Sequence, residues 1–260
     1  MDASMWIAKT GLDAQQTRMS VISNNLANVN TVGFKRDRAS FEDMLYQSVR
    51  QPGGQNTANT QAPTGLMLGT GVRLVSTEKT HVQGSLVTTK GALDLAIQGE
   101  GFFQITQPDG TIAYTRDGGF KKSATGQLVT ANGAPLLPAI NIPANAATIT
   151  IGQDGIVSVE LAGGGNQQIG QIQLSRFVNP AGLQSLGQNL LRETPASGPP
   201  QVLNPGANGA GNLMQGALEA SNVNVVEEMV SMIETQRAYE INSKAISAVD
   251  GMLKYLNNNL

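Results

Sequence analysis

The stretch SNNLANVNTVGFKR, from Ser23 to Arg36, decides how the start of this chain folds. Its apolar residues continue a series that begins at Met5 and advances in steps of three and four, which is typical of one face of a helix. Asn24, Asn25 and Asn28 fall on another arc, about 100° wide, on the opposite side. Asparagine is a poor helix former, and lysine or glutamate would solubilise a helix surface better. A face covered with amides therefore needs a specific reason.

The apolar series forms a heptad-like seam with one polar member. A seam this thin is too narrow to bury a helix in a globular core, so it predicts a partner helix. Gly33 supplies a natural helix stop. The seam consists of Met5, Ala8, Leu12, Gln15, Met19, Ile22, Leu26 and Val29.

The end of the chain mirrors its start. Asn224 with Glu227 resembles a capping box, and a helix from Val225 to Leu256 would be about 50 Å long. Its apolar runs are joined through Arg237 by extra four-residue steps, which resemble a stutter. We expect the two terminal seams to pack on each other. The C-terminal seam consists of Val223, Val226, Val230, Ile233, Ile241, Ala245, Ala248, Met252 and Tyr255.

Between the helices the pattern predicts antiparallel strands joined by tight turns. The turns are expected at Asp109-Gly110, Asn132-Gly133 and Asp154-Gly155. Turn signals at this spacing favour a compact sheet or a barrel-like domain. The Gly- and Pro-rich segments Gln47 to Gly65 and Glu193 to Gly211 are expected to be disordered as isolated loops.

The composition limits the classes of function. Only 14% of residues are charged, against about 25% in ordinary globular proteins, which suits either surfaces buried against neighbours or a β-rich domain. A net charge of −2 argues against nucleic-acid or anionic-membrane binding. Without cysteine, disulfides and Zn–Cys sites are excluded. Neither a secretory signal nor a membrane span is predicted, and composition alone favours the cytoplasm.

The sequence offers little chemistry. The single histidine, His81, is predicted to be a solvated or hydrogen-bonded strand residue. Without cysteine or a second histidine it cannot form an ordinary zinc site. Asp109 and Asp154 read as turn residues, and Glu227-Glu228 read as first-turn acids favoured by the helix dipole. A converging pair among the 19 acids stays open. No cofactor, metal or small-molecule ligand is predicted.

Two long motifs carry a family resemblance. SNNLANVNTVGFKR and SNVNVVEEMVSMIETQRAYEINSKAI resemble the N- and C-terminal signatures of the rod and hook family of the bacterial flagellum. FEDMLYQSVRQPG, GLMLGTGVR, GEGFFQI and TRDGGF resemble the distal-rod members of that family, and the likeness covers nearly the whole chain. The opening, Met5 to Gly11, departs slightly from the pattern.

The resemblance implies an α+β fold: terminal helices paired as a coiled-coil-like unit, and a central antiparallel, barrel-like β domain. It also implies a non-enzymatic subunit that polymerises helically around an export channel and transmits torque. The expected segments are a helix at 1–33, a connector at 34–75 with a rod-specific loop at 46–65, a β domain at 76–188, a return linker at 189–215 and a helix at 216–260.

The implied partners are further copies of the chain, proximal rod, hook and ring proteins, and the flagellar type III export apparatus. The resemblance places the protein in the basal body within the periplasm, exported without a cleaved signal, which overrides the cytoplasmic interpretation. Alternatives are a hook or proximal rod subunit, a periplasmic peptidoglycan hydrolase, and an adhesin-like β protein.

Two sets of residues are predicted to serve assembly. Amides donate and accept hydrogen bonds without stacking like charges between copies, which explains the asparagines as a hypothesis. Loop residues ordered between subunits would suppress sliding. The expected interface comprises Met5, Leu12, Met19, Ile22, Leu26, Val29, Asn24, Asn25, Asn28, Val226, Val230, Ile233, Ile241, Ala245, Ala248, Met252 and Tyr255. The expected rigidity loop comprises Tyr46, Gln51, Pro52, Gln55 and Pro63.

Overall fold

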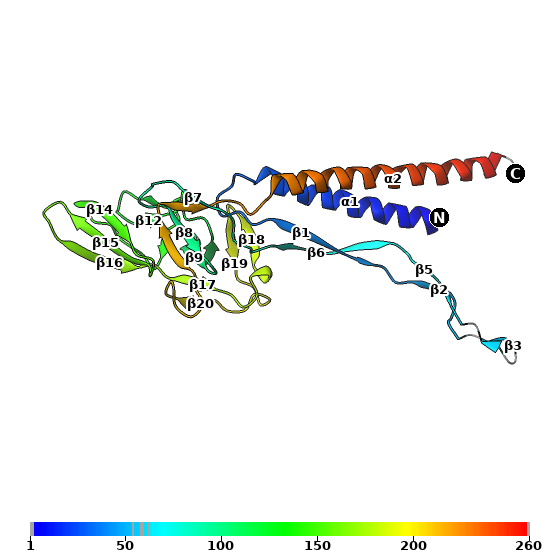
Figure 1. Cartoon of the computed structure of the whole chain (residues 1–260), viewed down its shortest axis with the longest axis horizontal. Coiled ribbons are helices and arrows are strands. Elements are labelled where there is room, and N and C mark those ends of the chain that lie inside the picture. Colours follow the sequence, from blue (N-terminus) through cyan, green and yellow to red (C-terminus); the bar gives the residue numbers. More distant parts are fainter. Residues whose placement is uncertain (1–2, 54, 58–59, 62, 259–260) are drawn as a thin grey trace. The chain divides into compact units, whose positions relative to one another are not determined.

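The computed structural model describes residues 3–53, 55–57, 60–61 and 63–258 (Figure 1). These residues form two compact units. Unit 1 comprises Met1–Leu26, Asp37–Glu78 and Asn224–Leu260, and unit 2 comprises Ala27–Arg36 and Lys79–Val223. The chain therefore passes between the units four times: after Leu26, after Arg36, after Glu78 and after Val223.

Unit 1 contains both long helices, α1 (Ala3–Ala27) and α2 (Val225–Asn258). The prediction of a helix at each end of the chain is confirmed. Asn224 caps α2, because its Oδ1 accepts a hydrogen bond of 3.0 Å from the Val226 N–H. The first turn of α2 is acidic, as the helix dipole favours.

Helix α1 ends earlier than predicted. The Thr31 N–H donates to the Asn28 carbonyl, and the Thr31 hydroxyl donates to Asn28 Oδ1, both at 3.1 Å. Such local bonds compete with the helical pattern. Gly33 follows with φ +69°, and a Cβ there would lie 2.7 Å from the Asp117 backbone nitrogen. Asn28 and Val29 thus lie beyond the helix, and the prediction that Val29 continues its seam is wrong.

The connector forms a two-stranded ribbon in unit 1. The Met44 N–H donates to the Gly71 carbonyl at 2.9 Å, and the Thr70 hydroxyl donates to the Leu45 carbonyl at 2.6 Å. The expectation of a disordered loop is therefore not met in its described part; residues 54, 58–59 and 62 lie outside the description. The paired strands are β1 (Asp37–Asp43) with β6 (Val72–Lys79), β2 (Gln47–Arg50) with β5 (Leu66–Leu68), and β3 (Gln55–Thr57) with β4 (Thr60–Gln61).

Unit 2 is built on a seven-stranded antiparallel sheet. β9 and β10 are joined through the turn at Asp109-Gly110, where Gly110 has φ +82°. The edge strands β18 and β20 do not pair with each other in the described chain, so the sheet is open and the barrel-like part of the prediction is wrong. The sheet runs in the order β18 (Gln184–Gly187), β19 (Leu190–Arg192), β10 (Ile112–Thr115), β9 (Phe102–Thr106), β17 (Leu174–Arg176) and β20 (Gln201–Leu203), with β13 (Leu136–Leu137) also on β9.

Smaller sheets complete unit 2. The turn predicted at Asp154-Gly155 joins β14 to β15, and the one at Asn132-Gly133 lies between β12 and β13. A 3₁₀ turn, η1, spans Pro180–Gly182. The remaining strands are β14 (Ala146–Ile151), β15 (Ile156–Leu161) and β16 (Asn166–Gln171) in one sheet, and the pairs β8 (Leu95–Gln98) with β21 (Asn212–Gln215), β7 (Leu86–Thr88) with β22 (Ala217–Glu219), and β11 (Lys121–Lys122) with β12 (Leu128–Val129).

The segment expected as a return linker, 189–215, is part of this β structure. It supplies β19, β20 and β21, which pair with β10, β17 and β8. Its Gly and Pro residues form turns between these strands, so a composition typical of a linker is here a set of tight connections.

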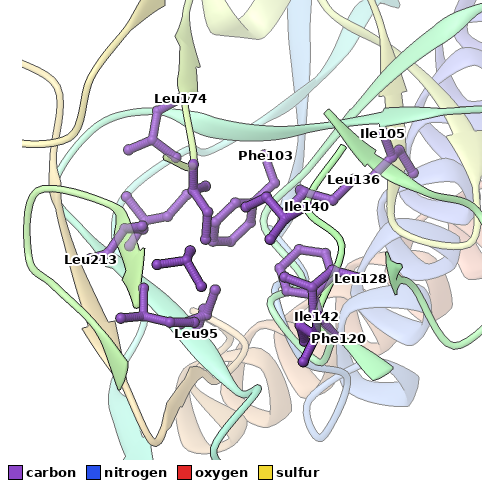
Figure 2. Packing of buried hydrophobic residues seen from close by; sticks show 14 of the residues in the cluster. Leu95, Phe103, Ile105, Phe120, Leu128, Leu136, Ile140, Ile142, Leu174 and Leu213 are labelled. Atoms are coloured by element: carbon purple, nitrogen blue, oxygen red, sulfur yellow. The ribbon is translucent and has the colours of Figure 1, made fainter. Parts of the chain in front are cut away.

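The core of unit 2 lies between these sheets (Figure 2). Phe103 and Phe120 are fully buried, with ring centroids 5.1 Å apart in an edge-to-face arrangement. Aliphatic side chains from β8, β12, β13 and β21 surround them. Unit 2 therefore has a hydrophobic core of its own.

Candidate assembly surface

The helices of unit 1 contact each other through a face of α2 that is mostly polar. A Cβ added to Gly11 would lie 3.1 Å from Asn242 Nδ2, which places the helices side by side. Glu228 and Thr235 on α2 are buried, and with Asn242 they are spaced seven residues apart. On α1 the buried residues are Ala14, Ile22 and Asn25. The intramolecular seam of α2 is therefore not the apolar one that the sequence predicted.

The predicted apolar seam of α2 lies on the other side of the helix. At about 100° per residue its members centre roughly 140° around the helix from Glu228, Thr235 and Asn242. The expectation that it packs on α1 within the subunit is wrong. Its large side chains are exposed by 69% (Val226), 51% (Val230), 51% (Ile233), 66% (Ile241), 61% (Met252) and 70% (Tyr255). Ala245 and Ala248 are exposed as well. We call these eight residues the α2 stripe.

The predicted seam of α1 is only partly covered. Ile22 is 5% exposed and belongs to the interior of the subunit. The other helical members of the predicted interface are half-buried, and they are Met5, Leu12, Met19 and Leu26.

One residue of the asparagine face, Asn25, forms its hydrogen bonds within the subunit. Asn25 is 1% exposed, and its amide both donates to the Asp37 carbonyl and accepts from the Asp37 N–H, each at 2.9 Å. It also donates to Glu228 Oε2 at 3.4 Å. An amide is required because one side chain must supply a donor and an acceptor to the same backbone. The prediction that Asn25 contacts a neighbouring copy is therefore wrong.

The other two asparagines differ from Asn25. Asn24 is exposed and donates to Asp37 Oδ2 at 3.4 Å. Asn28 is half-buried in the turn after α1. The sequence thus identified the chemistry of the amides, but not which of them acts inside the chain.

The ribbon carries a second exposed apolar surface, of which the predicted rigidity loop included only Tyr46. Leu45 is 91% exposed and Tyr46 is 57% exposed. The alternation in LYQSV and GLMLGTGVRLV was the signal available for it. The other large apolar side chains exposed here are Val49, Leu66, Met67, Leu68, Leu74 and Val75. We call this set, with Leu45 and Tyr46, the ribbon surface.

The residues of the predicted rigidity loop lie on this ribbon. Gln51, Pro52 and Pro63 are exposed, as is Tyr46, whose ring covers Gly69. The backbone of Gln55 belongs to β3, and its side chain lies outside the description. Two ion pairs, Arg38 with Glu78 and Arg73 with Glu42, link β1 to β6.

The acidic residues and the histidine do not form a metal site in the described part of the chain. Among the residues that the structure describes, no three His, Asp or Glu side chains are grouped so as to hold a metal ion. Neither described helix is long and apolar enough to cross a bilayer. Asp109 and Asp154 accept bonds from the backbone of Thr111 and Ile156, as the turn interpretation predicts.

His81 is a structural residue between β6 and β7, not a strand residue. Its ring stands edge-on to Phe102, with centroids 5.5 Å apart. Burial, together with the nearby positive charges of Lys35 and Arg116, lowers the pKa of His81 to about 4. The imidazole is therefore neutral at pH 7.

Three family models match the chain. They are the Flagella basal body rod protein over residues 5–35, the Flagellar hook protein FlgE/F/G D1 domain over 96–159, and the Flagellar basal body rod FlgEFG protein C-terminal over 214–259. The first match covers α1 from Met5 onward, the last includes all of α2, and the middle one includes β9, β10, β14 and most of β15.

Full-length relatives extend this match. Flagellar basal-body rod proteins FlgG from two Buchnera aphidicola subspecies, Schizaphis graminum and Acyrthosiphon pisum, are 59% and 57% identical to the chain; each alignment covers 98% of the chain and 99% of the relative. A flagellar basal-body rod protein FlgF from Caulobacter vibrioides is 36% identical over 92% of the chain and 90% of its own length. The chain is therefore more similar in sequence to these two FlgG proteins than to this FlgF protein, and both kinds of alignment cover most of the chain.

Proposed function

The chain belongs to the FlgG family of flagellar basal-body rod proteins, and from that premise we propose that it polymerises helically into the distal rod, a stiff hollow shaft that transmits torque to the hook. It is a structural subunit of the flagellar rod, located in the basal body, and not an enzyme. The hydrolase alternative has no support in the family or in the described side chains.

The α2 stripe is the observation that carries the proposal. Six large apolar side chains lie on one face of this long helix, and each is more than half exposed. A monomeric soluble protein rarely exposes so large an apolar surface. The face of α2 that meets α1 is already occupied by Glu228, Thr235 and Asn242. The stripe is therefore directed at other copies, and the coiled-coil-like packing predicted from sequence is completed between subunits instead of within one.

The remaining interface residues follow from the same placement. Half-buried Met5, Leu12, Met19 and Leu26 contribute their exposed parts, and Val29 contributes from the turn. Asn24 and Asn28 provide neutral contacts where charges would repeat along the lattice. The predicted order of helix, connector, β domain and helix is kept, but residues 189–215 belong to the β domain and do not form a separate linker.

The ribbon surface supports a second contact. A hairpin fixed by strand pairing and ion pairs loses little further freedom on docking, so its exposed apolar side chains can act as a strut between copies. In this account Tyr46, Gln51, Pro52, Gln55 and Pro63 suppress sliding between protofilaments.

The free subunit is expected to have largely disordered ends. α1 buries three residues, and two of the buried residues of α2 are polar, so isolated helices gain little to offset the entropy of ordering. Such ends suit passage through the flagellar type III apparatus without a cleaved signal, followed by assembly in the periplasm against rod, hook and ring proteins.

Polymerisation of purified subunits, followed by sedimentation and electron microscopy, tests the proposal. Val230→Glu with Ile233→Glu should abolish polymers, because charges would be buried at every contact. Val202→Glu, at a 48% exposed position on β20, is the matched control and should polymerise normally. Asn24→Asp with Asn28→Asp should also abolish growth while unit 2 stays folded. Normal polymers from the stripe variant would contradict the proposal.

A further inference from the structure

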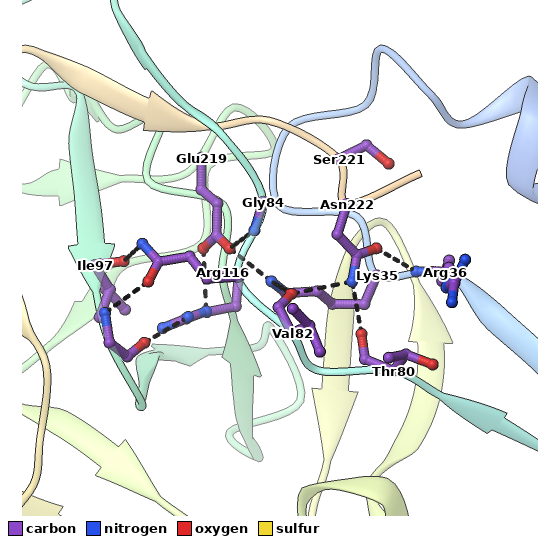
Figure 3. Close-up of polar contacts among 12 residues, drawn as sticks. Lys35, Arg36, Thr80, Val82, Gly84, Ile97, Arg116, Glu219, Ser221 and Asn222 are labelled. Carbon is purple, nitrogen blue, oxygen red and sulfur yellow. Dashed lines mark hydrogen bonds and ion pairs between the residues drawn. The ribbon is translucent and has the colours of Figure 1, made fainter. Parts of the chain in front are cut away.

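Three sequence motifs that lie far apart in the chain meet at one buried cluster in unit 2 (Figure 3). Lys35 comes from GFKR, Arg116 from TRDGGF, and Glu219 from the end of β22. Lys35 Nζ lies 2.6 Å from Glu219 Oε1, and Arg116 Nε lies 3.2 Å from Glu219 Oε2. The three side chains are 3%, 5% and 0% exposed. The Glu219 carboxylate thus forms ion pairs with two cationic side chains, and all three groups are shielded from solvent.

Each charged group also binds backbone from a further segment. Lys35 donates to the Val82 carbonyl at 2.8 Å, and Glu219 Oε1 accepts from the Gly84 N–H at 2.9 Å. Arg116 donates to the carbonyls of Gly99 and Gly101, both at 2.7 Å. The cluster therefore fixes backbone atoms as well as side chains.

Asn222 connects the chain at three of its four passages between the units. Its Oδ1 accepts from the Arg36 N–H at 2.8 Å, next to the passage after Arg36. Its Nδ2 donates to the Thr80 carbonyl at 2.8 Å, just past the passage after Glu78. Asn222 itself immediately precedes the passage after Val223. The Thr80 N–H donates to the Arg36 carbonyl at 2.9 Å and closes the triangle.

The backbone segments around Gly33, Gly84 and Glu219 also pack closely against one another. A Cβ on Gly84 would lie 2.1 Å from the Ala220 carbonyl oxygen, so only glycine fits beside the outgoing strand. The Gly33 N–H donates to the Glu219 carbonyl at 2.8 Å. Movement of one segment would therefore break bonds to the others.

A contribution to folding stability does not by itself explain why charged side chains occupy this buried cluster. Burying two cations with one carboxylate is costly, and apolar side chains of similar volume often serve as well. Burial lowers the pKa of Lys35 despite its carboxylate partner, which reflects that cost. Directional bonds, unlike apolar contacts, hold each segment at one register.

We propose that Lys35, Arg116, Glu219 and Asn222 form a lock that prevents the chain from flexing where it passes out of unit 2, and that this lock stiffens the assembled rod. The lock is a property of the single subunit. Only its consequence for the rod rests on the proposed function.

Two variants test the lock, one by removing its buried charge and the other by removing the hydrogen bonds of Asn222. Glu219→Gln removes the shared charge at nearly constant volume. Asn222→Ala removes only the cross-ties and leaves no buried charge unpaired. The matched control is Ser175→Ala, whose hydroxyl is fully buried in the same unit and bonded to Gln104 at 2.6 Å, outside the locked segments.

Hydrogen exchange on the purified subunit gives the local measurement. Both variants should accelerate exchange in residues 33–36, 79–84 and 217–223 on the order of tenfold, because these amides open locally, while β9 stays protected. The control should leave exchange in these segments at the wild-type rate. Unchanged exchange in Asn222→Ala, or equal acceleration of β9, would overturn the lock. If Glu219→Gln fails to fold, Asn222→Ala decides.

Electron micrographs of polymers give the mechanical measurement. Asn222→Ala rods should bend with a persistence length several-fold shorter than wild type, as expected when a joint in every subunit loosens. Rods as straight as wild type, despite faster exchange, would overturn the mechanical role. If wild-type subunits form no polymer, the proposed function fails, and the exchange experiment still decides the lock.

Discussion

Replacing Asn25 with aspartate tests why an amide is needed at the end of α1. The carboxylate would lose the donor to the Asp37 carbonyl and would lie 3.4 Å from Glu228 Oε2, a repulsion of about 5 kcal/mol at an effective dielectric constant near 20. Protonating the new side chain is the cheaper response. From an ordinary pKa of about 3.9, that costs about 4 kcal/mol at pH 7 and about 1.5 kcal/mol at pH 5.

The critical concentration for polymerisation measures this penalty, since α1 and α2 are expected to order fully only in the polymer. Asn25→Asp should raise it about a thousandfold at pH 7 and only about tenfold at pH 5. The sign follows from the raised pKa in the polymer: the protonated form is compatible with assembly, so the defect grows as pH rises above the ordinary value.

Asn25→Ala is the matched control, because it also deletes the bonds to Asp37 but cannot titrate. It should cost about 1–3 kcal/mol with no rescue at low pH beyond that of the wild type. A critical concentration for Asn25→Asp within about threefold of wild type at pH 7, or a defect equal at both pH values, would refute this reasoning.

Unit 2 allows three further tests by thermal unfolding. Gly118→Ala would place a Cβ 1.6 Å from the Leu95 carbonyl oxygen and should cost at least about 3 kcal/mol, whereas Gly163→Ala, with open space around it, should stay within about 0.5 kcal/mol; similar losses would contradict the close approach. Phe103→Ala in the core should cost about 3–5 kcal/mol and lower Tm by roughly 10 °C, and a Tm near wild type would contradict the assigned core. The pKa of His81 is depressed to about 4, so unfolding takes up a proton as pH falls from 6.5 and stability falls by at most about 3 kcal/mol. His81→Gln should remove that part of the pH dependence, and an unchanged profile would show that another group causes it.

Local patterns in the sequence were sufficient for the elements of the fold. Steps of three and four predicted both helices, and Asp-Gly and Asn-Gly pairs predicted the turns, because these signals depend on neighbouring residues only. The return linker was misjudged because Gly and Pro mark tight turns between short strands as readily as flexible chain. The open sheet could not be distinguished from a barrel, since closure depends on pairing between distant strands.

The side of α2 that faces α1 could not be predicted from one chain. Apolar periodicity identifies a face that will be buried, but it does not say whether the same chain or another copy covers it. Here the intramolecular face carries Glu228, Thr235 and Asn242, and the apolar face is exposed. Burial of Lys35 was equally hidden, because its carboxylate partner, Glu219, lies 184 residues further along the chain.

Hydrogen exchange across the α2 stripe, compared between the free subunit and the polymer, tests the central claim most directly. We expect residues 225–255 to exchange rapidly in the free subunit and to become protected on polymerisation, while β9 and β10 are protected in both states. A free subunit with α2 already fully protected, whose protection does not change when polymers form, would contradict the claim that these helices acquire their stable packing from neighbouring copies.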